Sequence, residues 1–312
     1  YFITGCTGFI GIHLSRKLIA EGHEIVGLVR NPGKIPPDLL GKLKEIKGGM
    51  EIFERADLIL PEVDVVIHLA GVITGRSSKD YERMNYESVV HLLACLNRQH
   101  WKPKRFILAS SLAAAGPNRN SLNLRESDKA APIEPYGLAK LKAEHLLKSQ
   151  PFPTTAFRPP AVIGPGDPAM LTLFKMVNRG FAPLPSGKVQ LLSYIYVGDL
   201  VDAIYIMSKE KSEEHKLYFT TADDVITNHD IIREIATSLE KKALIVRIPK
   251  GLIWLIMVFS TAISYVFRTP NFYDYRQYKQ MTAPAFVCAG ELLTAETRSE
   301  EHTSELQSPY VI

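Results

Sequence analysis

Three side chains near the middle of the chain have the types and spacing needed for proton and hydride transfer. Tyr136 and Lys140 lie four positions apart at the start of an expected helix, so both point to the same helix face. An ammonium group beside a phenol should lower the phenol pKa from about 10, which would let Tyr136 act as acid or base near neutral pH. Ser111 follows an apolar strand, at the edge where open parallel sheets bind ligands, and its hydroxyl could hydrogen-bond a reacting oxygen.

A glycine-rich turn near the start of the chain predicts a site for a nucleotide pyrophosphate. Residues 4–11 hold three glycines at three-residue intervals, between an apolar strand at residues 1–3 and an amphipathic helix at 9–21. Glycine permits positive φ and a close approach of backbone N–H groups to phosphate oxygens. The helix N-terminus adds about half a positive charge.

Apolar runs alternate with helical patterns, which implies a parallel sheet covered by helices on both faces. The predicted fold class is α/β: a Rossmann-type doubly wound parallel sheet with a smaller, interleaved C-terminal substrate domain. Strands are expected at 24–29, 65–69, 105–109 and 155–157, and helices near 81–99, 136–148 and 169–179.

The sequence also predicts how the domains divide. Residues 1–164 should form the NAD(P)-binding domain, and the Pro- and Gly-rich stretch 164–168 marks a change of character. Residues 193–210 should return to the first domain, with 194–197 rejoining the main sheet. Residues 165–192 and 211–297 are left to form the substrate domain, or lid.

Composition excludes several classes of function. With 312 residues and 46% hydrophobic content, the chain can bury a large core. A net charge of +4 without a basic stripe argues against a nucleic-acid partner. The three cysteines, Cys6, Cys95 and Cys288, are not spaced as metal ligands, so no metal site and a reducing cytoplasm are expected. No signal peptide is visible, which also favours a cytoplasmic location.

Both ends of the chain are unusual. The sequence opens without methionine inside the expected first strand, so we expect a few residues upstream. Residues 298–308 resemble the translation of a widely used sequencing-adapter oligonucleotide. We therefore interpret 298–312 as a disordered artefact outside the fold, the alternative being a polar natural terminus.

One apolar stretch leaves two interpretations open. Residues 252–267 carry no charge but are fewer than the about 20 residues that span a bilayer, and they include Ser260, Thr261 and Ser264. A membrane-spanning helix is therefore disfavoured. The stretch could bury its apolar face in the lid or over an apolar substrate, or it could make a peripheral contact with a membrane surface.

The chain resembles extended short-chain dehydrogenases/reductases, the NAD(P)-dependent epimerase/dehydratase superfamily, from residue 1 to about residue 297. Ser111 precedes Tyr136 by 25 positions, which matches the catalytic spacing of that family. The resemblance is carried by residues 4–11, 68–71, 111–116, Tyr136 with Lys140, 158–159 with 164–167, and 196–199.

The resemblance implies roles for individual residues. Ser111, Tyr136 and Lys140 would form the catalytic triad, hydride would pass between nicotinamide C4 and an oxygen-bearing substrate carbon, and Lys140 would also hold the nicotinamide ribose. Asn85 would lie near the cofactor, although a helix-surface asparagine without a role is an equal alternative. A homodimer through helices 81–99 and 136–148 would be usual for the family. The predicted cofactor-binding residues are Gly5, Thr7, Gly8, Phe9, Ile10, Gly11, Arg30, Leu69, Ala70, Gly71, Asn85, Tyr136, Lys140, Pro159 and Val162.

The end of the second expected strand bears on the choice of cofactor. Members that prefer NAD carry an acidic residue there, whereas this chain has Val29 followed by Arg30. Because an arginine suits a 2′-phosphate, NADP(H) is favoured over NAD(H). Gly49 stands where many relatives have an adenine-contacting aspartate, so the sequence does not say which residue contacts the adenine.

Departures from the family patterns narrow the choice of substrate class. Sugar-nucleotide 4,6-dehydratases place an Asp-Glu pair directly after their Ser/Thr, where this chain has Leu112 and Ala113. Sugar-nucleotide epimerases usually have an asparagine and a tyrosine where this chain has Ala161 and Ala115.

Residues 158–160 and 283–288 resemble instead the branch that holds 3β-hydroxysteroid dehydrogenases and dihydroflavonol-type reductases. The leading hypothesis is an NADP(H)-preferring oxidoreductase that interconverts a secondary alcohol and a ketone on a fairly apolar, steroid-like or polyketide-like substrate. The alternatives are a sugar-nucleotide epimerase and, from another class, a non-catalytic NAD(P)-binding scaffold or redox sensor.

Overall fold

The computed structural model describes residues 1–118, 123–187, 189–267 and 274–298. Of the segment interpreted as an artefact, only Arg298 belongs to a described element, and residues 299–312 lie outside the described residues.

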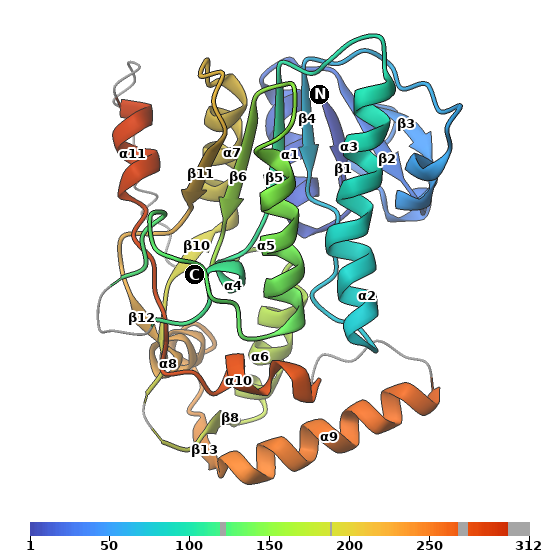
Figure 1. The fold of residues 1–312 in the computed structure, drawn as a ribbon. Helices are drawn as coiled ribbons and strands as arrows, with labels where there is room; N and C mark the ends of the chain where they lie inside the picture. Colours follow the sequence, from blue (N-terminus) through green and yellow to red (C-terminus); the bar gives the residue numbers. More distant parts are fainter. Residues whose placement is uncertain (119–122, 188, 268–273, 299–312) are drawn as a thin grey trace.

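A seven-stranded parallel sheet is the centre of the molecule, and this confirms the predicted fold class (Figure 1). The strands lie in the order β11-β6-β5-β4-β1-β2-β3, so the chain runs outward from β1 in one direction and then outward from β4 in the other. This reversal leaves a crevice at the carboxyl ends of β1 and β4, where doubly wound sheets bind ligands. The strands are β1 (Phe2–Thr4), β2 (Ile25–Val29), β3 (Leu43–Lys47), β4 (Val65–His68), β5 (Arg105–Ala109), β6 (Thr154–Arg158) and β11 (Lys216–Phe219).

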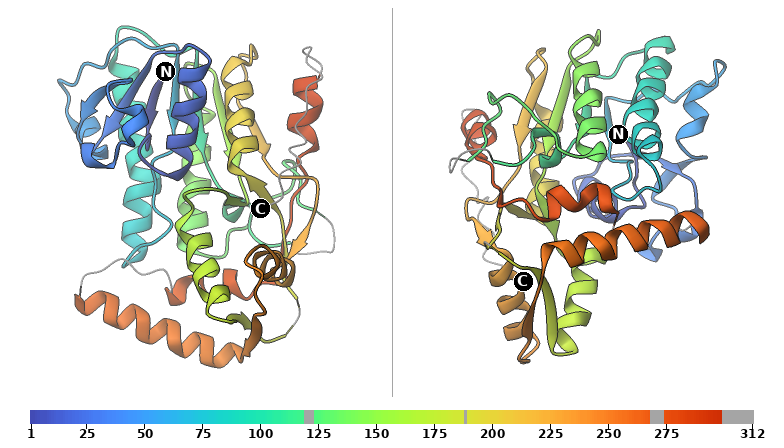
Figure 2. Two further views of the ribbon diagram at one scale, coloured as in Figure 1. Left: turned by 180° about the vertical axis from the view of Figure 1, so that it is seen from behind. Right: turned by 60° about the horizontal axis from the view of Figure 1, so that its bottom comes forward.

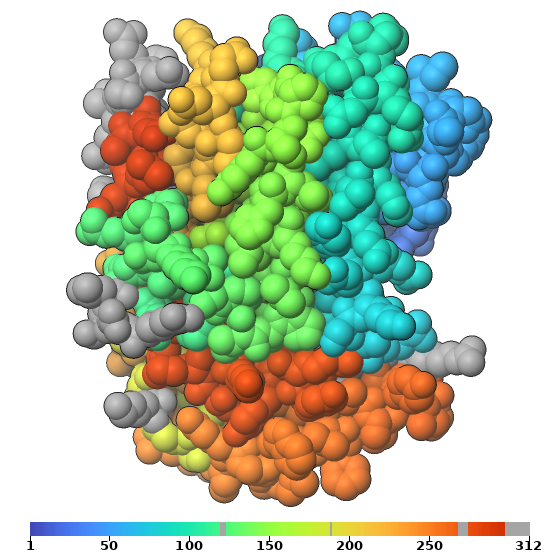
Figure 3. Space-filling view, in the orientation of Figure 1, coloured from blue at the N-terminus to red at the C-terminus, as the bar shows by residue number. Residues whose placement is uncertain are grey.

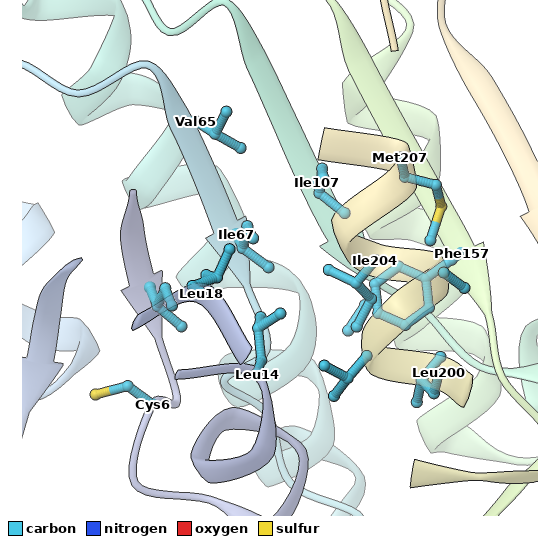
Figure 4. Close-up of a cluster of buried hydrophobic side chains, with 14 of the residues drawn as sticks. Cys6, Leu14, Leu18, Val65, Ile67, Ile107, Phe157, Leu200, Ile204 and Met207 are labelled. Carbon is cyan, nitrogen blue, oxygen red and sulfur yellow. The ribbon is translucent and has the colours of Figure 1, made fainter. Parts of the chain in front are cut away.

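Helices cover both faces of the sheet, as Figure 2 shows from behind. On one face α1 (Phe9–Ala20) and α7 (Val197–Lys209) pack against Ile67 and Ile107, and Figure 4 shows this cluster. On the other face α3 (Ser88–Arg98) and α5 (Pro135–Leu147) pack against the alternate strand residues. Alternation along buried strands therefore gives two separate apolar layers. Helix α3 continues α2 (Ser78–Glu82) and the π-helical turn η4 (Arg83–Glu87), and three 3₁₀ turns, η1 (Pro32–Lys34), η2 (Pro37–Leu39) and η3 (Met50–Glu54), precede β4.

A second region lies beyond the carboxyl ends of the main strands (Figure 1). It contains three small sheets, in which β7 pairs with β10, β8 with β13, and β9 with both β12 and β14. Helices α6 and α8 contribute Val177 and Ile232 to its own apolar cluster. The elements are α4 (Leu112–Ala115), β7 (Ala161–Ile163), α6 (Pro168–Asn178), β8 (Phe181–Pro185), β9 (Leu191–Leu192), β10 (Tyr194–Tyr196), β12 (Ile226–Thr227), α8 (Asn228–Ser238), β13 (Leu244–Ile248), α9 (Lys250–Phe267), η5 (Tyr275–Gln277), α10 (Tyr278–Met281) and β14 (Ala285–Phe286). The last helix, α11 (Glu291–Arg298), lies beside β11 of the main sheet (Figure 1).

Two strands of the later chain pair differently from expectation. The prediction that residues 194–197 rejoin the main sheet is wrong, because β10 pairs with β7 instead. Strand β11 comes from the stretch 211–297 that was expected in the lid, yet it is the edge strand of the main sheet beside β6. A short apolar run identifies a strand but not its partner, which depends on long-range packing. Helix α7 packs on the main sheet, as expected for residues 193–210. The division of the chain into two interleaved domains remains our proposal.

Helix α9 does not bury its apolar face. Ile253, Met257 and Ser264 are buried, whereas Phe259 is 67% and Ile263 is 57% exposed. The interpretation that this stretch buries its apolar face in the lid is therefore wrong, and a role over an apolar substrate stays a prediction. Among the residues that the structure describes, α9 is the one helix that is long enough and apolar enough to cross a membrane, by length and composition alone.

Candidate active site

The turn between β1 and α1 has no room for side chains at two of its glycines. Gly5 has φ of +80°, and a Cβ there would lie 2.8 Å from the Ala70 nitrogen. A Cβ on Gly11 would lie 2.1 Å from the Gly5 carbonyl oxygen. Gly5 therefore lets the turn lie directly against the residues that follow β4, where the sheet reverses direction, and Gly11 lets α1 pack closely on the turn itself.

The N-terminus of α1 is suited to an anion. Gly8 caps the helix without a side-chain hydrogen bond, and the first turn contains no acidic residue. The first backbone N–H groups of a helix have no partner within it and carry partial positive charge. Thr7 precedes the cap, and Phe9 and Ile10 form the first turn. These residues and the glycines fit the pyrophosphate of a dinucleotide.

The end of β2 places Arg30 at the same edge of the sheet. Arg30 is exposed and comes directly after Val29, whose carbonyl accepts a hydrogen bond from Gly48 at 3.1 Å. At Gly49, a Cβ would lie 2.4 Å from a carboxylate oxygen of Glu51. The Glu51 carboxylate thus lies beside Gly49, the position where many relatives have an aspartate. Because Glu51 is two residues later in the chain, comparing position 49 with the family pattern did not reveal it.

Ser111 and Tyr136 meet at the carboxyl end of β5. Ser111 caps α4, its hydroxyl accepting a hydrogen bond from the Ala113 nitrogen at 3.2 Å, and the same hydroxyl lies near the Tyr136 phenol and acts to lower its pKa. Tyr136 lies in the first turn of α5, where the Glu134 carboxylate caps the helix by accepting from the Tyr136 nitrogen at 2.7 Å. The structure therefore brings the predicted serine and tyrosine together.

The pKa of Tyr136 moves in the opposite direction from expectation. Burial raises it to about 12, while the Ser111 hydroxyl acts to lower it. The Lys140 ammonium lies 5.9 Å from the centre of the Tyr136 ring and donates to the Ala109 carbonyl at 2.7 Å. The expectation that Lys140 lowers the phenol pKa below its usual value is wrong for this arrangement, because desolvation is the larger effect. At neutral pH Tyr136 is a proton donor.

Lys140 lies beside the residues that follow β4. A Cβ on Gly71 would lie 3.2 Å from Lys140 Nζ and 2.6 Å from Asn85 Oδ1. Asn85 is fully buried, accepts from the Val72 nitrogen at 3.1 Å and donates to the Tyr81 carbonyl at 3.1 Å. The alternative that Asn85 lies on a helix surface is therefore wrong, and the asparagine fixes the loop at 71–72.

Burial also shifts the pKa of Lys140 and its neighbour His68. Burial lowers the pKa of Lys140 to about 8, and the Glu144 carboxylate opposes that shift. His68, at the end of β4, has its pKa lowered to about 3 by burial and by the Lys140 charge. Its Nδ1 pairs with Thr4 Oγ1 at 2.7 Å. His68 is thus a neutral ring beside the lysine, a contribution that the motif at 68–71 did not reveal.

A buried ionic network, also missed by the sequence analysis, lies behind Lys140. Arg158 Nη2 donates to Glu144 Oε2 at 2.7 Å and its Nε donates to Oε1 at 2.8 Å. The Ser110 hydroxyl donates to the same Oε1. Glu144 is four residues beyond Lys140 on α5, so helical spacing was the available signal.

The remaining predicted cofactor residues border the same crevice. Leu69 donates from its backbone to Thr4, at the end of β1. Pro159 directly follows β6 and accepts from the Leu112 nitrogen at 2.9 Å, and Val162 lies in β7. No group of three or more His, Cys, Asp or Glu residues that could hold a metal ion occurs among the described residues.

A cavity of about 1000 Å³ lies on the lid side of β7 and β10. Phe174, Tyr194 and Leu293 line it, together with the carboxylates of Asp199 and Glu234, and no lysine or arginine is among its described lining residues. None of Ser111, Tyr136 and Lys140 lines it. A cavity lined in this way is unsuited to a diphosphate.

Comparisons with known proteins show the family to which the chain belongs. Residues 1–219 match the model of the NAD dependent epimerase/dehydratase family. The chain is 26% identical to a UDP-glucose 4-epimerase of Vibrio cholerae over 270 residues, covering 82% of this chain and 80% of that protein. It is 31% identical to a ceramide reductase of Caulobacter vibrioides over 179 residues, covering 57% of this chain and 50% of that protein. A solved UDP-glucose 4-epimerase from Thermus thermophilus in complex with NAD has a TM-score of 0.72 at 21% identity, covering 95% of this chain and 92% of that one.

The fold and the crevice define a dinucleotide-binding enzyme of the extended short-chain dehydrogenase/reductase type. The chain belongs to the NAD dependent epimerase/dehydratase family. It is an enzyme that uses NAD(P), as that family does.

Proposed function

We propose that this enzyme transfers hydride between NADP(H) and a secondary alcohol or ketone on an apolar, lipid-like substrate. The observation that carries the proposal is the meeting of Ser111, Tyr136 and Lys140 beside Gly71, where the sheet reverses direction. A bound nicotinamide supplies or accepts the hydride at the substrate carbon.

The residues of the chain handle the proton and the oxygen. In ketone reduction, hydride adds to the carbonyl carbon, and the Tyr136 phenol gives its proton to the carbonyl oxygen. Ser111 donates a hydrogen bond to that oxygen, and the Lys140 ammonium stabilises the negative charge left on Tyr136. Because the pKa of Tyr136 is raised, the phenol holds at neutral pH the proton that ketone reduction needs.

Leu112 and Ala113, directly after Ser111, are both buried and apolar, so no acid pair is present there for water elimination and a dehydratase is disfavoured. The apolar substrate is supported by the similarity to a ceramide reductase, a protein named for acting on a lipid. The relatives named above give no support to a steroid-like substrate, so we propose a long-chain ketone.

A sugar-nucleotide epimerase is the second candidate, favoured by the similarity to the Vibrio cholerae enzyme over most of both chains. An epimerase would retain NAD and reduce its own oxidised intermediate. Ala115 and Ala161 stand where epimerases usually have a tyrosine and an asparagine, which weakens this candidate.

Turnover of two substrates separates the candidates. We expect purified protein to oxidise NADPH when given a long-chain 3-keto lipid and to leave UDP-glucose unchanged. Interconversion of UDP-glucose and UDP-galactose without net consumption of cofactor would replace our proposal with the epimerase.

We propose that Arg30 selects NADP(H) through the 2′-phosphate. We expect Arg30→Ala to raise the KM for NADPH about 10- to 100-fold, because a charge-assisted hydrogen bond contributes about 1.5–3 kcal/mol. The KM for NADH should change less than about twofold. Arg16→Ala is the matched control, because Arg16 is also exposed but pairs with Asp38 at 2.8 Å. Equal KM changes for the two cofactors would contradict the assignment.

We further propose that the enzyme acts in the cytoplasm, at a membrane surface, as a homodimer formed through α3 and α5. Helices of this face are the usual dimer contact in the family. Light scattering of the purified protein would measure its mass directly, and a monomer at micromolar concentration would contradict the dimer.

A further inference from the structure

Helix α9 exposes an apolar stripe to the outside, whereas a surface helix of a water-soluble protein has polar side chains there. Seven large apolar side chains lie at helical spacing on the side away from the protein. By contrast, Ser264 is buried and Thr261 Oγ1 accepts from the Tyr275 nitrogen at 3.2 Å, on the side toward the protein. We define the α9 face as Leu252, Leu255, Ile256, Phe259, Ile263, Val266 and Phe267, which are 45–72% exposed.

The apolar surface continues onto the strand that precedes the helix. In β13, Leu244 is 71% and Val246 is 41% exposed, and Leu244 lies opposite the exposed Phe181 of β8. Strand β13 connects to α9 at the end of the molecule remote from the amino ends of the main strands (Figures 1 and 2). In the space-filling view, α9 forms the lower border of the molecule (Figure 3). An exposed apolar surface of this extent marks an interaction site.

The exposed charges on the segment that carries this surface are of one sign. Between Glu240 and Asp274 the sequence has no acidic residue, while Lys241, Lys242, Arg247 and Lys250 are exposed there. Asp274 itself is buried and paired with Arg276 at 2.7 Å. An apolar face with cations on its own segment complements the anionic headgroups and acyl chains of a bilayer. A second copy of this chain would bring the same cations together.

The two ends of α9 decide how it meets the bilayer. Its N-terminal end follows β13, and η5, on the C-terminal side, is tied to the main domain where Arg276 donates to the Arg76 carbonyl at 2.7 Å. An 18-residue helix that crossed a bilayer would place its ends about 27 Å apart on opposite sides. Because both ends are held by one folded body, α9 lies along the surface instead.

We propose that the α9 face docks the enzyme onto an anionic bilayer and that its substrate reaches the active site from that side. Entry from this side is proposed because η5 connects α9 with the neighbourhood of the active site: Gln277 donates to the Ile73 carbonyl at 2.8 Å and to the Tyr81 hydroxyl at 3.3 Å. The Tyr81 ring lies 6.5 Å from that of Tyr136. The docking proposal depends only on the observations of α9, whereas the entry of a lipid substrate from that side depends on the proposed function.

Sedimentation with vesicles tests the docking. We expect the full-length protein to bind vesicles of phosphatidylcholine with about 30% phosphatidylglycerol, and to bind pure phosphatidylcholine at least about tenfold more weakly. Fluorescence gives a second measurement that needs no variant. Trp254 on α9 is 45% exposed while Trp101 is buried, so emission should shift to shorter wavelength when vesicles are added.

Paired variants assign the binding to α9. Phe259→Ser with Ile263→Ser should weaken vesicle binding at least about tenfold, since two large apolar side chains no longer enter the bilayer. Leu40→Ser with Ile59→Ser removes two side chains that are 57% and 80% exposed elsewhere, and should leave binding unchanged. Both variants should keep the melting temperature and the rate of reduction of a water-soluble ketone.

Three results would overturn the docking proposal. These are wild-type protein that remains in the supernatant with both vesicle types, self-association through α9 without vesicle binding, and protein that only detergent releases from membranes. Failure to reduce any ketone while vesicle binding persists would instead refute the proposed function and leave the docking intact.

Discussion

Tyr136→Phe should lower kcat for ketone reduction about 10²- to 10⁴-fold, the usual contribution of a positioned general acid. The variant removes one oxygen from a side chain whose phenol lies near Ser111, and nothing else in the ring changes. We therefore expect NADPH affinity and the melting temperature to stay close to those of the wild type. Steady-state kinetics and a fluorescence titration with NADPH measure these quantities separately.

Tyr86→Phe is the matched control for that variant. Tyr86 lies on η4, and the Lys142 ammonium is 5.6 Å from the centre of its ring, close to the 5.9 Å between Lys140 and the Tyr136 ring. A tyrosine beside a lysine is therefore common to both sites, and only one has Ser111. We expect kcat of Tyr86→Phe within about twofold of wild type. Wild-type turnover by Tyr136→Phe would contradict the role of Tyr136 as proton donor, whereas no turnover by either protein would favour the non-catalytic scaffold.

The main strands were predictable because burial on both faces leaves an uninterrupted apolar run. Residues 24–29 and 105–109 were predicted as strands, and β2 and β5 occupy nearly the same positions. Strand β3 was missed because its sequence, Leu-Lys-Glu-Ile-Lys, is largely exposed at the sheet edge. Strand β11 was missed for a related reason, since an edge strand need not be apolar throughout.

The site was predictable only where spacing along the chain fixes proximity. Tyr136 and Lys140 are one helical turn apart, and Ser111 follows its strand, so the sequence places all three at one edge of the sheet. The direction of the Tyr136 pKa shift was not predictable, because it depends on burial by segments far apart in the sequence. The exposure of α9 was unpredictable for the same reason, as periodicity does not say which face is covered.

Glu144→Gln should destabilise the fold by about 3–5 kcal/mol, because it leaves the buried Arg158 without its counter-charge. The side chains of Arg158 and Glu144 are 3% and 4% exposed, and two hydrogen bonds join them. Glu82→Gln is the matched control, since Glu82 pairs with Lys142 at the same 2.7 Å but the two are 32% and 43% exposed. An exposed pair should contribute less than about 1 kcal/mol. Urea unfolding at neutral pH measures both variants.

The same substitution should shift the pH dependence of catalysis through Lys140. The Glu144 carboxylate raises the pKa of Lys140, opposing the burial that lowers it to about 8. Without that carboxylate the lysine loses its proton at lower pH, so kcat should decline at a lower alkaline pH than in the wild type. Glu82→Gln should leave this alkaline limit unchanged. An unshifted alkaline limit of kcat in a folded Glu144→Gln protein would mean that the Glu144–Arg158 pair has a structural role only. The double variant Glu144→Gln with Arg158→Met should recover much of the lost stability and should keep the shifted alkaline limit.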